Sequence, residues 1–410
     1  MEGAPNLLAG LDEDSLHVLN RLSSEGGTWI VGGWVRDALA SVPGADVDIA
    51  TSLSPDQVVG LFPDSLTHGA RFGTICVRTP KSNRTWEVTS LRTEAGYTDG
   101  RRPDVVEFGE DIIEDLSRRD FTVNSMAIAF PSGDFLDPFE GMADLGSRVI
   151  RTVGDPSKRF SEDGLRILRA YRFIASPGGW FLDKGTESAI RDCIGMISSV
   201  SAERIGSEFR RMINLESGGE SLRLMRDHGL LEKILPGAEL IEGLCPTSDL
   251  AVAMALMYKE SSVDAVVASE TIKSNLKATK EEVSIFGLLM TLHPSTSLTS
   301  AEEVRRFHVY VPPNWKDSVI AYLDWFGVDR TEVLREVPPP RAGAAPLVDG
   351  NTLSEYTGIE PGVRLGRLKG HLHRLQIERD LTHQNEVLGL LGEIDFAGED
   401  HFGWKSLSWP

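Results

Sequence analysis

The spacing of hydrophobic and polar residues divides the chain into a first part with short strand-like runs and a longer helical part. Up to about residue 150, runs of Val, Ile, Thr and aromatic residues are bounded by Gly, Pro, Asp or Asn, a pattern typical of strands. Two segments beside them have helical spacing. This part is therefore expected to be α/β or α+β. The predicted strands are TWIVGG, DVDIAT, FGTICVRT, TWEVTSL and VVEF, and the predicted helices are DSLHVLNRLSS and PDQVVGLF.

From about Phe160 onward, apolar residues recur at intervals of three and four, which predicts amphipathic helices. Residues 336–346, rich in Pro, Ala and Gly, are expected to link or cap subdomains. Helical spacing then resumes in GVRLGRLKGHLHRLQIERDL, where glycines are expected to interrupt the helix. An all-helical remainder thus follows the mixed N-terminal domain. The clearest runs before residue 336 are SEDGLRILRAYRFIAS, AERIGSEFRRMIN, GESLRLMRDHGLLEKIL and TKEEVSIFGLLMTL.

Length and composition narrow the class of protein. A chain of 410 residues is too long for one compact core, so several domains are expected. The composition, 41% hydrophobic and 25% charged, is that of a soluble globular protein, and no apolar run reaches the ~18 residues of a membrane span. The N-terminus lacks the features of a secretory signal, and three widely spaced cysteines predict neither a disulfide framework nor a zinc site. We therefore expect a cytoplasmic protein that does not enter a membrane.

The charge is distributed unevenly along the chain. The net charge of −19 argues against nucleic-acid binding, which usually uses a basic surface. Residues 146–235, however, contain 15 Lys and Arg against 12 Asp and Glu, a local surplus of three positive charges. Such a segment is compatible with binding along a phosphate backbone and, equally, with ordinary solvated helix faces.

Two aspartates in the segment IVGGWVRDALASVPGADVDIAT predict a metal site. On a strand, Asp46 and Asp48 point to the same face, and two carboxylates there need a compensating cation. Mg²⁺ is typically held by one or two carboxylates together with substrate phosphates. Two such ions would stabilise the attacking and the leaving oxygen of a phosphoryl transfer. A solvated aspartate pair at a sheet edge is the alternative for these two residues alone.

Glycines and an arginine just upstream extend this prediction to a phosphate site. Gly32 and Gly33 lie between a predicted strand and the predicted helix WVRDALA, where glycine lets the backbone approach a phosphate. Arg36 is expected in the first turn of that helix, as a contact for the phosphates. The segment is not a Walker loop, because it lacks Gly-Lys-Ser/Thr.

The segment RRDFTVNSMA carries candidate contacts to the rest of a nucleotide. Arg119 is expected to hold phosphates. Asp120 and Asn124 are four residues apart, so both would reach the sugar hydroxyls if the segment is helical. A polar helix start is the alternative.

The segment RFSEDGLRILRAYRF predicts a helix face that recognises a base. Asp163, Arg166, Arg169 and Arg172 recur every three residues, and three arginines on one stripe repel unless anions lie along it. Side by side, Asp163 and Arg166 offer an acceptor next to a donor. Cytosine and adenine present the matching amino group and ring nitrogen, whereas uracil and guanine present the reverse. The pair is thus expected to accept CTP and ATP; a surface i,i+3 salt bridge is the alternative.

These segments occur in the order found in a known family. The chain resembles the class II tRNA nucleotidyltransferases, which are the CCA-adding enzymes of bacterial and eukaryotic type with the related bacterial poly(A) polymerases, over residues 29–391. The resemblance implies an α+β fold, with a polymerase-beta-like head built on a mixed sheet, followed by all-helical neck, body and tail domains. We place these at residues 1–150, 151–215, 216–335 and 336–410, with the neck selecting the nucleotide and the tail binding tRNA. The matching segments are VGGWVRDAL…DVDIAT, RRDFTVNSMA, DPFEGMADL, GDPSKRFSEDGLRILRAYRF, SAERIGSEFRRM and LVDGNTLSEYTGIEPGVRLGRL.

The resemblance also implies a role for each candidate residue. The chain departs from the family pattern at Ser125, where alanine is usual, and at Gly164, which is expected to lower the stability of the helix by ~1 kcal/mol. YTDGRRPDVVEF resembles the flexible loop that helps these enzymes pass from C to A addition, which favours a full CCA-adding enzyme over a CC-adding one. The implied roles are Asp46 and Asp48 on Mg²⁺, Gly33, Arg36 and Arg119 on the triphosphate, Asp120 and Asn124 near the ribose, Asp163 and Arg166 on the base edge, and Arg169 and Arg172 as further nucleotide or phosphate contacts.

We therefore predict the template-independent addition of C, C and A to the 3′ end of tRNA from CTP and ATP, with release of pyrophosphate. An A-adding enzyme or a poly(A) polymerase is an alternative with the same motifs. A catalytically idle RNA-binding scaffold is the alternative from another class of protein. The Asp46/Asp48 pair argues against the scaffold, because a non-catalytic protein need not keep two like charges on one strand face.

Overall fold

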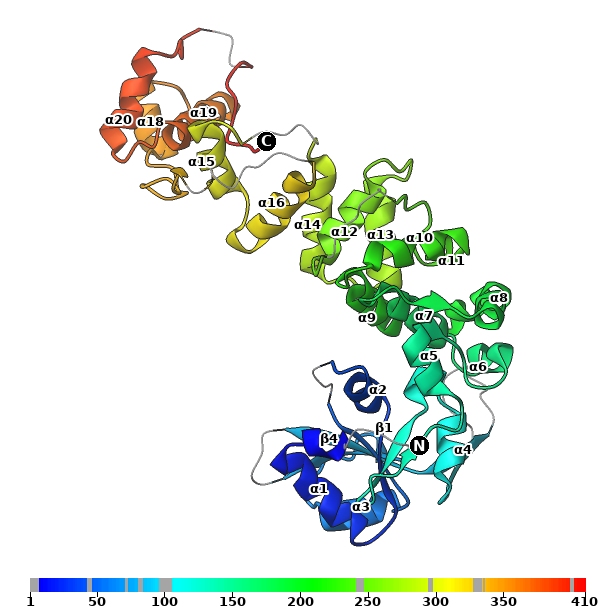
Figure 1. Ribbon diagram of the computed structural model, residues 1–410. Coiled ribbons are helices and arrows are strands. Elements are labelled where there is room, and N and C mark those ends of the chain that lie inside the picture. The colour runs from blue at the N-terminus through cyan, green and yellow to red at the C-terminus, as the bar shows by residue number, and fades with distance from the viewer. Residues whose placement is uncertain are drawn as a thin grey trace. The chain divides into compact units, whose positions relative to one another are not determined.

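The structure is a computed structural model that describes residues 7–42, 46–70, 73–79, 84–95, 105–240, 247–293, 298–326, 334, 336–398 and 402–410 (Figure 1). It consists of two compact units. Most of the loop segment YTDGRRPDVVEF lies outside the described residues. Unit 1 comprises Met1–Pro236, Glu242–Ser248 and Ser274–Lys277, and unit 2 comprises Gly237–Ile241, Asp249–Lys273 and Ala278–Pro410.

Unit 1 begins with a mixed six-stranded sheet in the order β3-β4-β2-β1-β7-β8. In this sheet β2 and β4 are parallel, and all other neighbouring strands are antiparallel. The predicted strands all form, so the mixed α+β character of this part is confirmed. The strands are β1 (Thr28–Val31), β2 (Asp48–Thr51), β3 (Thr74–Arg78), β4 (Thr85–Ser90), β7 (Ala127–Phe130) and β8 (Phe135–Leu136), with two-stranded sheets of β5 (Arg92–Ala95) and β6 (Val105–Phe108), and of β9 (Val149–Ile150) and β10 (Phe181–Leu182).

The sheet is covered on both faces because successive residues of each strand point in opposite directions. Ile30 belongs to the larger core, which also contains side chains of α1 (Glu13–Ser23), α2 (Gly33–Leu39) and α3 (Pro55–Leu61). Its neighbour Val31 belongs to a smaller core on α4 (Ile112–Ser117). Trp86 is almost fully buried, and its indole nitrogen donates to the hydroxyl of Ser15, so this large side chain ties β4 to α1.

The rest of unit 1 is mostly helical, as its periodicity predicts (Figure 1, cyan to green), but the pairing of β10 with β9 shows that the expectation of an all-helical remainder is wrong. The helix α7 supplies much of its core, since eight of its eleven residues are buried, and it packs against α9 and α10. The helices are α5 (Gly141–Ser147), α6 (Pro156–Glu162), α7 (Leu165–Ala175), α8 (Lys184–Cys193), α9 (Ala202–Ile213), α10 (Gly218–Asp227) and α11 (Leu230–Ile234).

Two of the predicted helical runs are each divided into two helices. SEDGLRILRAYRFIAS is broken at Asp163, whose extended backbone (φ −151°) separates α6 from α7. A Cβ on the next residue, Gly164, would lie 2.5 Å from the carbonyl oxygen of Met196, so this glycine allows a close approach of two backbones. GESLRLMRDHGLLEKIL is broken at Gly229, which has a φ of 79°. Local spacing predicts the helices but not the tertiary contacts that end them.

The short segment Ser274–Lys277 belongs to unit 1, although residues on both sides of it belong to unit 2. The amide of Asn275 donates to the carbonyl of Ile234, and Arg210 donates to the carbonyl of Leu276. A Cβ on Gly206 would lie 2.0 Å from that same carbonyl oxygen, so α9 has a glycine where this segment crosses it. Unit 1 is therefore completed by residues that are distant from it in sequence.

The described residues of unit 2 form helices joined by loops and turns, with no strand among them. The longest helix, α19, is continuous, so the expected interruption by glycines is wrong. Gly370 lies within it, where a Cβ would meet the Ser406 hydroxyl at 2.7 Å, so this glycine makes room for the C-terminal segment. The helices are α12 (Leu250–Tyr258), α14 (Lys280–Thr291), α15 (Ala301–Tyr310), α16 (Lys316–Trp325), α18 (Gly350–Thr357), α19 (Val363–Glu378) and α20 (Gln384–Gly389), and α13 (Ala265–Asn275) spans both units.

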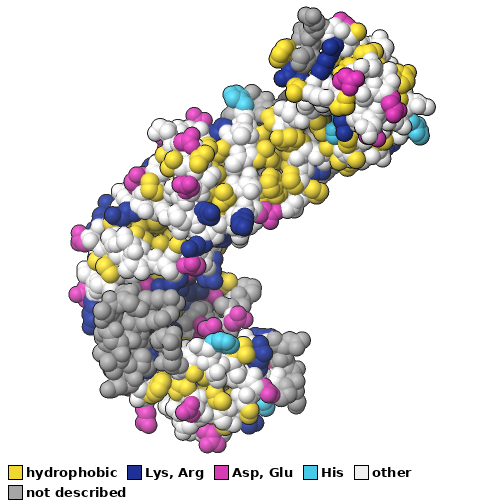
Figure 2. Space-filling model, turned by 180° about the vertical axis from the view of Figure 1, so that it is seen from behind, with side chains coloured by type: hydrophobic (Ala, Val, Ile, Leu, Met, Phe, Trp, Pro, Cys, Tyr) yellow, Lys and Arg dark blue, Asp and Glu magenta, His cyan; other side chains and the backbone are white. Residues whose placement is uncertain are grey.

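On the face shown in Figure 2, basic side chains are interspersed with acidic and apolar ones over the described residues. The net charge is thus not separated into one acidic and one basic region on this face. Among the described helices, none is long and apolar enough to cross a bilayer.

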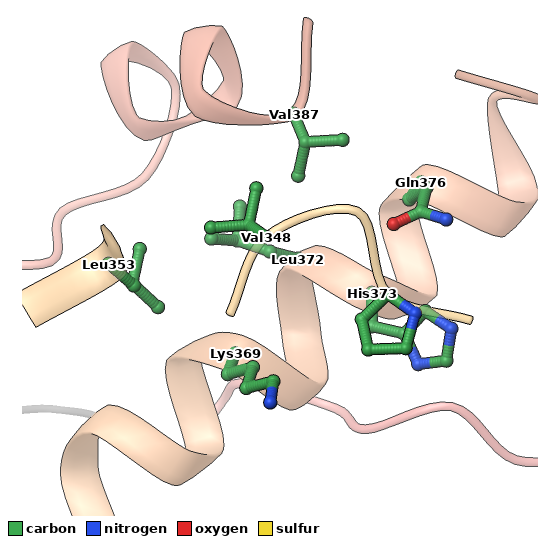
Figure 3. Close-up of a pocket in the computed structure, with 8 residues that line it drawn as sticks. Val348, Leu353, Lys369, Leu372, His373, Gln376 and Val387 are labelled. Carbon is green, nitrogen blue, oxygen red and sulfur yellow. The ribbon is translucent and has the colours of Figure 1, made fainter. Parts of the chain in front are cut away.

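The Pro-rich segment 336–346 packs against α19. His373 and Gln376 each hydrogen-bond a backbone carbonyl of this segment, at Ala344 and Ala345. Figure 3 shows both side chains on α19, beside the apolar contact of Val348, Leu353, Leu372 and Val387. The segment therefore covers the core of the last helices, which corresponds to the expected capping role rather than to the linking role.

Candidate active site

The site begins where β1 turns into α2. Gly32 has a φ of 73°, a conformation that favours glycine, and the register of β1 and β2 pairs the preceding Val31 with Asp48. A Cβ on Gly32 would lie 3.1 Å from Oδ2 of Asp48 and 3.2 Å from Nη1 of Arg119. Because Gly32 has no side chain, its backbone lies close to both the Asp48 carboxylate, a group suited to a cation, and the Arg119 guanidinium, a group suited to a phosphate.

The predicted carboxylate pair is only partly on a strand. Asp48 is the first residue of β2 and half-buried, whereas Asp46 precedes the strand and is exposed. Burial and the negative charges of Glu87 and Asp46 raise the pKa of Asp48 to about 6, against the opposing effect of Arg119 and Arg36. Burial, and then its acidic neighbours, thus disfavour the ionised form of Asp48, and the two arginines do not fully offset them. Glu87 was not predicted as a site residue; it comes close to Asp48 because β4 pairs with β2.

These acidic groups fit a divalent cation. A cation beside Asp48 would favour its ionised form, which burial and its acidic neighbours disfavour. Within the described parts of the chain, no group of three His, Cys, Asp or Glu side chains converges as a self-sufficient metal site. An ion that takes one or two carboxylates and completes its shell with substrate phosphates matches this arrangement.

Arg119 is held loosely. Its Nη1 lies 3.3 Å from the carbonyl oxygen of Asn124, and its Nη2 lies 3.4 Å from Oδ2 of Asp115. Its Nε is buried and has no hydrogen-bond partner among the described residues. A guanidinium with an unpaired N–H group, next to the backbone of Gly32, is suited to bind an anionic ligand.

Asp120 and Asn124 are brought together as predicted, but by a single 3₁₀ turn (Thr122–Asn124). The Asn124 amide donates to Asp120 at 3.0 Å and accepts from Nη1 of Arg36 at 2.7 Å. Burial alone would raise the pKa of Asp120, but the charge and hydrogen bond of Arg169 and the bonds from Asn124 and the Phe121 amide lower it to about 2. Arg36 is the fourth residue of the seven-residue helix α2, so it lies in the first turn as expected and, because the helix is short, also in the last.

The predicted stripe Asp163–Arg166–Arg169–Arg172 is not one helix face, because Asp163 lies between α6 and α7. Asp163 accepts two hydrogen bonds from Arg204 of α9, at 3.0 and 2.7 Å. Arg166 donates to Glu162 at 2.7 Å and to the carbonyl of Arg118 at 2.9 Å. Asp163 and Arg166, the two candidates for base recognition, are therefore each held by a different partner. They do not form the i,i+3 salt bridge with each other that was the alternative.

Carboxylates of the protein itself accompany the other two arginines. Arg169 donates to Asp120 at 2.6 Å, and Arg172 donates to Glu208 of α9 at 2.6 Å. The expected repulsion along α7 is thus relieved within the fold. Arg204 and Glu208 both lie in SAERIGSEFRRM and were not among the residues predicted for the site. Their spacing of four residues, which puts both on one face of a helix, is the sequence feature that could have identified them.

Comparison with known proteins places this site in a class. Residues 28–151 match the family described as "Poly A polymerase head domain", and residues 179–241 match "Probable RNA and SrmB- binding site of polymerase A". The head that carries the candidate active site is thus that of a nucleotidyltransferase.

Similarity to complete proteins narrows the class. A CCA-adding enzyme of Streptococcus gordonii is 39% identical over 406 residues, covering 92% of this chain and 96% of that protein. A CCA-adding enzyme of a Geobacillus species is 40% identical over 219 residues, 53% of each protein, so this chain matches about half the length of that relative. The chain belongs to the family of CCA-adding enzymes, and the family assignment made from its motifs is confirmed.

Solved structures agree in fold. The crystal structure of the Bacillus stearothermophilus CCA-adding enzyme in complex with CTP superposes with a TM-score of 0.74 at 26% identity, over 95% of this chain and 98% of that one. The Thermotoga maritima CCA-adding enzyme complexed with tRNA has a TM-score of 0.67 at 18% identity, over 95% and 97%. The predicted fold class, a mixed-sheet head followed by helices, is confirmed.

Proposed function

We propose that this chain adds C, C and A to the 3′ end of tRNA from CTP and ATP, without a template, and releases pyrophosphate. The observation that carries the proposal is the close approach of the Asp48 carboxylate and the Arg119 guanidinium to the bare backbone of Gly32, which brings a group suited to a cation beside a group suited to a phosphate. Similarity to CCA-adding enzymes over nearly the whole chain supports the choice of substrates.

Membership in a nucleotidyltransferase family implies the use of a divalent metal ion. We propose that the ion is Mg²⁺, held by Asp46 and Asp48 with Glu87 adding to the local negative charge. When bound, it would activate the attacking hydroxyl and neutralise charge on the phosphates. Gly33, Arg36 and Arg119 would hold the triphosphate, so that the 3′ hydroxyl of tRNA attacks the α-phosphate in line with the leaving pyrophosphate.

Base selection is proposed for Asp163 and Arg166. Arg204 holds the Asp163 carboxylate from one side, which leaves lone pairs to accept the amino group of cytosine or adenine. Glu162 orients Arg166, whose remaining N–H groups would donate to the adjacent ring nitrogen. Asp120 and Asn124 would contact the ribose, with Arg169 and Arg172 stabilising this side of the site.

The four-domain division at residues 150, 215 and 335 is retained within this proposal, with the tail binding tRNA. We also propose that the protein acts in the cytoplasm, where its predicted substrates would be available.

An extension assay tests the proposed function. One tRNA is prepared with three 3′ ends, lacking CCA, ending in C and ending in CC, and each is offered CTP, ATP, both, UTP or GTP with Mg²⁺. We expect two C residues, one A and a stop. A single A on the CC end alone would identify an A-adding enzyme, and a long A ladder a poly(A) polymerase.

The idle-scaffold alternative predicts no extension with any end. It also predicts no divalent-ion binding in the presence of CTP, which Mn²⁺ relaxation measures directly. Binding of Mn²⁺ that disappears in Asp48→Asn would exclude the scaffold even before turnover is observed.

A further inference from the structure

A buried carboxylate in the short helix α4, that of Asp115, holds two consecutive arginines. Its side chain is only 1% exposed, and a charge buried to this degree requires paired partners. Both Nε and Nη2 of Arg118 donate to Oδ1 of Asp115, Nε at 3.1 Å. Nη2 of Arg119 donates to Oδ2 at 3.4 Å. The two oxygens of one carboxylate therefore have different arginines as partners.

Arg118 connects Asp115 to the candidate for base recognition. The backbone carbonyl of Arg118 accepts a hydrogen bond from Nη2 of Arg166 at 2.9 Å. Nη1 of Arg166 donates to Glu162 at 2.7 Å and to the carbonyl of Arg159 at 3.0 Å. The orientation of the Arg166 guanidinium is thus set by acceptors on both terminal nitrogens. Because Asp115 fixes the side chain of Arg118, it also restricts where the carbonyl of that residue can lie.

Arg119 connects the same carboxylate to the candidate phosphate site. A Cβ on Gly32 would lie 3.2 Å from Nη1 of Arg119, whereas Nη2 is the nitrogen that contacts Asp115. The contact on Nη2 orients the guanidinium so that Nη1 stays beside Gly32. At 3.4 Å this contact is long, so the guanidinium can still adjust to an anion that approaches Nη1.

Holding both arginines before a ligand arrives favours binding. A long side chain that is ordered only on binding loses conformational entropy at that moment, and a preformed contact reduces this cost. The bonds of Asp115 to Arg118 and Arg119 would lower the cost on the base side and on the phosphate side of the site together.

We propose that Asp115 is a positioning residue for both base recognition and phosphate binding. It orients Arg119 directly and Arg166 through the carbonyl of Arg118, and it touches neither the base nor the phosphates. The inference rests on the proposed function for the roles of Arg119 and Arg166, and it adds the residue that links them.

Calorimetry separates the two roles without requiring catalysis. Dissociation constants are measured for CTP, UTP and inorganic tripolyphosphate, with Mg²⁺ and without tRNA. Tripolyphosphate has no base, so it reports on the phosphate side alone, and the preference for CTP over UTP reports on the base side. Asp115→Asn keeps the size of the side chain and removes its charge. We expect the dissociation constant to rise about threefold for tripolyphosphate and about tenfold for CTP, so that the preference falls about threefold.

A second variant tests the base side alone. Arg118→Lys keeps the positive charge but loses the contact through two nitrogens, so the residue is held less firmly by Asp115. We expect the preference for CTP over UTP to fall about twofold to threefold, with the dissociation constant for tripolyphosphate unchanged. This milder change keeps the proposal testable if Asp115→Asn does not fold.

The matched control is Glu378→Gln in unit 2. Glu378 is also a carboxylate that faces two arginines, Arg306 at 3.2 Å and Arg374 at 2.7 Å. It should lower the Tm, as Asp115→Asn should, and leave all three dissociation constants unchanged. A lower Tm with an unchanged preference in both Asp115→Asn and Arg118→Lys would show a purely structural role and overturn the proposal.

The proposed function can fail separately from this inference. If the wild-type protein binds CTP but the extension assay shows no addition of C, C and A, the proposed function is wrong, and the Asp115→Asn comparison still decides the positioning role. A wild-type protein that binds CTP no better than UTP would overturn the positioning role of Asp115 toward Arg166.

Discussion

The sheet edge at Gly32 and the arginine row of α7 differ in how fully their charges are paired. On α7, Arg166, Arg169 and Arg172 each lie 2.6–2.7 Å from a carboxylate oxygen. At the sheet edge, the hydrogen bonds of Arg119 to other described residues are 3.3–3.4 Å long, and acidic neighbours help raise the pKa of Asp48. The comparison indicates that the fold itself pairs the charges of α7, and we expect bound ligands to complete the sheet edge.

The largest expected effect comes from removing the incompletely compensated charge. Asp48→Asn should lower kcat at least about a thousandfold, because a contact to the metal contributes several kcal/mol to the transition state. The same variant should have a higher Tm at pH 8. The folded-state pKa of Asp48 is raised from 3.8 to about 6, so the ionised carboxylate destabilises the fold above about pH 6, and this penalty disappears as the pH falls toward 4.

Thermal unfolding between pH 4 and 8, together with single-turnover kinetics, measures both effects of Asp48→Asn. The control is Asp56→Asn, an exposed aspartate in α3 of the same unit. Near-normal turnover in Asp48→Asn would contradict the metal assignment, and a Tm below that of wild type at pH 8 would contradict the view that this edge is electrostatically incomplete.

Gly32→Ala should reduce kcat/KM about a hundredfold, because its Cβ would lie 3.1 Å from Asp48 and 3.2 Å from Arg119 and shift both side chains. The strained φ of 73° should also lower stability by about 1 kcal/mol. Gly358→Ala is a control for a positive φ alone, since Gly358 has a φ of 70° and a ψ of 8°, against a ψ of −136° at Gly32, and has open space around its Cα. Equal losses of activity in the two variants would assign the effect to backbone strain alone.

Asp120→Asn should destabilise unit 1 by about 2 kcal/mol at pH 7, since it removes the charge that Arg169 faces in a buried site. The pKa of Asp120 is lowered from 3.8 to about 2 in the folded state, so its contribution is present above about pH 4 and is lost as the pH falls toward 2. Urea unfolding at pH 7 and pH 3 measures this difference, which should be smaller at pH 3. A constant difference would show that ionisation of Asp120 does not contribute.

Arg204→Gln should have the smallest effect on rate and a clear one on base choice. Loss of the two bonds to Asp163 should reduce discrimination of CTP over UTP about tenfold, with kcat for CTP reduced less. Arg166→Ala should relax selection in the same direction. Arg191→Gln, which removes an exposed pair with Glu187, is the control. Unchanged discrimination in both site variants would remove the base-reading role from this region.

Sequence patterns predict this fold well where the information is local. The strands around Gly32 and Asp48 are identified because alternating apolar residues, glycines and aspartates lie within 22 residues of chain. Periodicity also identifies α7 and α9. It fails at Gly164, since the reason for this glycine is the Met196 carbonyl, which lies 32 positions away.

The partners of the predicted site residues are the part that sequence does not reveal. Arg204 binds Asp163 across 41 positions, and Glu87 influences Asp48 through strand pairing. Each has ordinary helical or strand spacing in its own segment, so its role depends on which elements pack together. A single sequence contains the residues of the site but not their pairing.

Segment Ser274–Lys277 has a consequence for the inheritance of this protein. Because its residues complete unit 1 from within the sequence of unit 2, no single cut in the chain separates the two units intact. A fragment that ends at Pro236 would lack the residues that contact α9 and Ile234. Recombination that exchanges C-terminal regions between related genes would replace these four residues together with unit 2. The new residues would then have to fit α9 and Ile234, which come from the other gene.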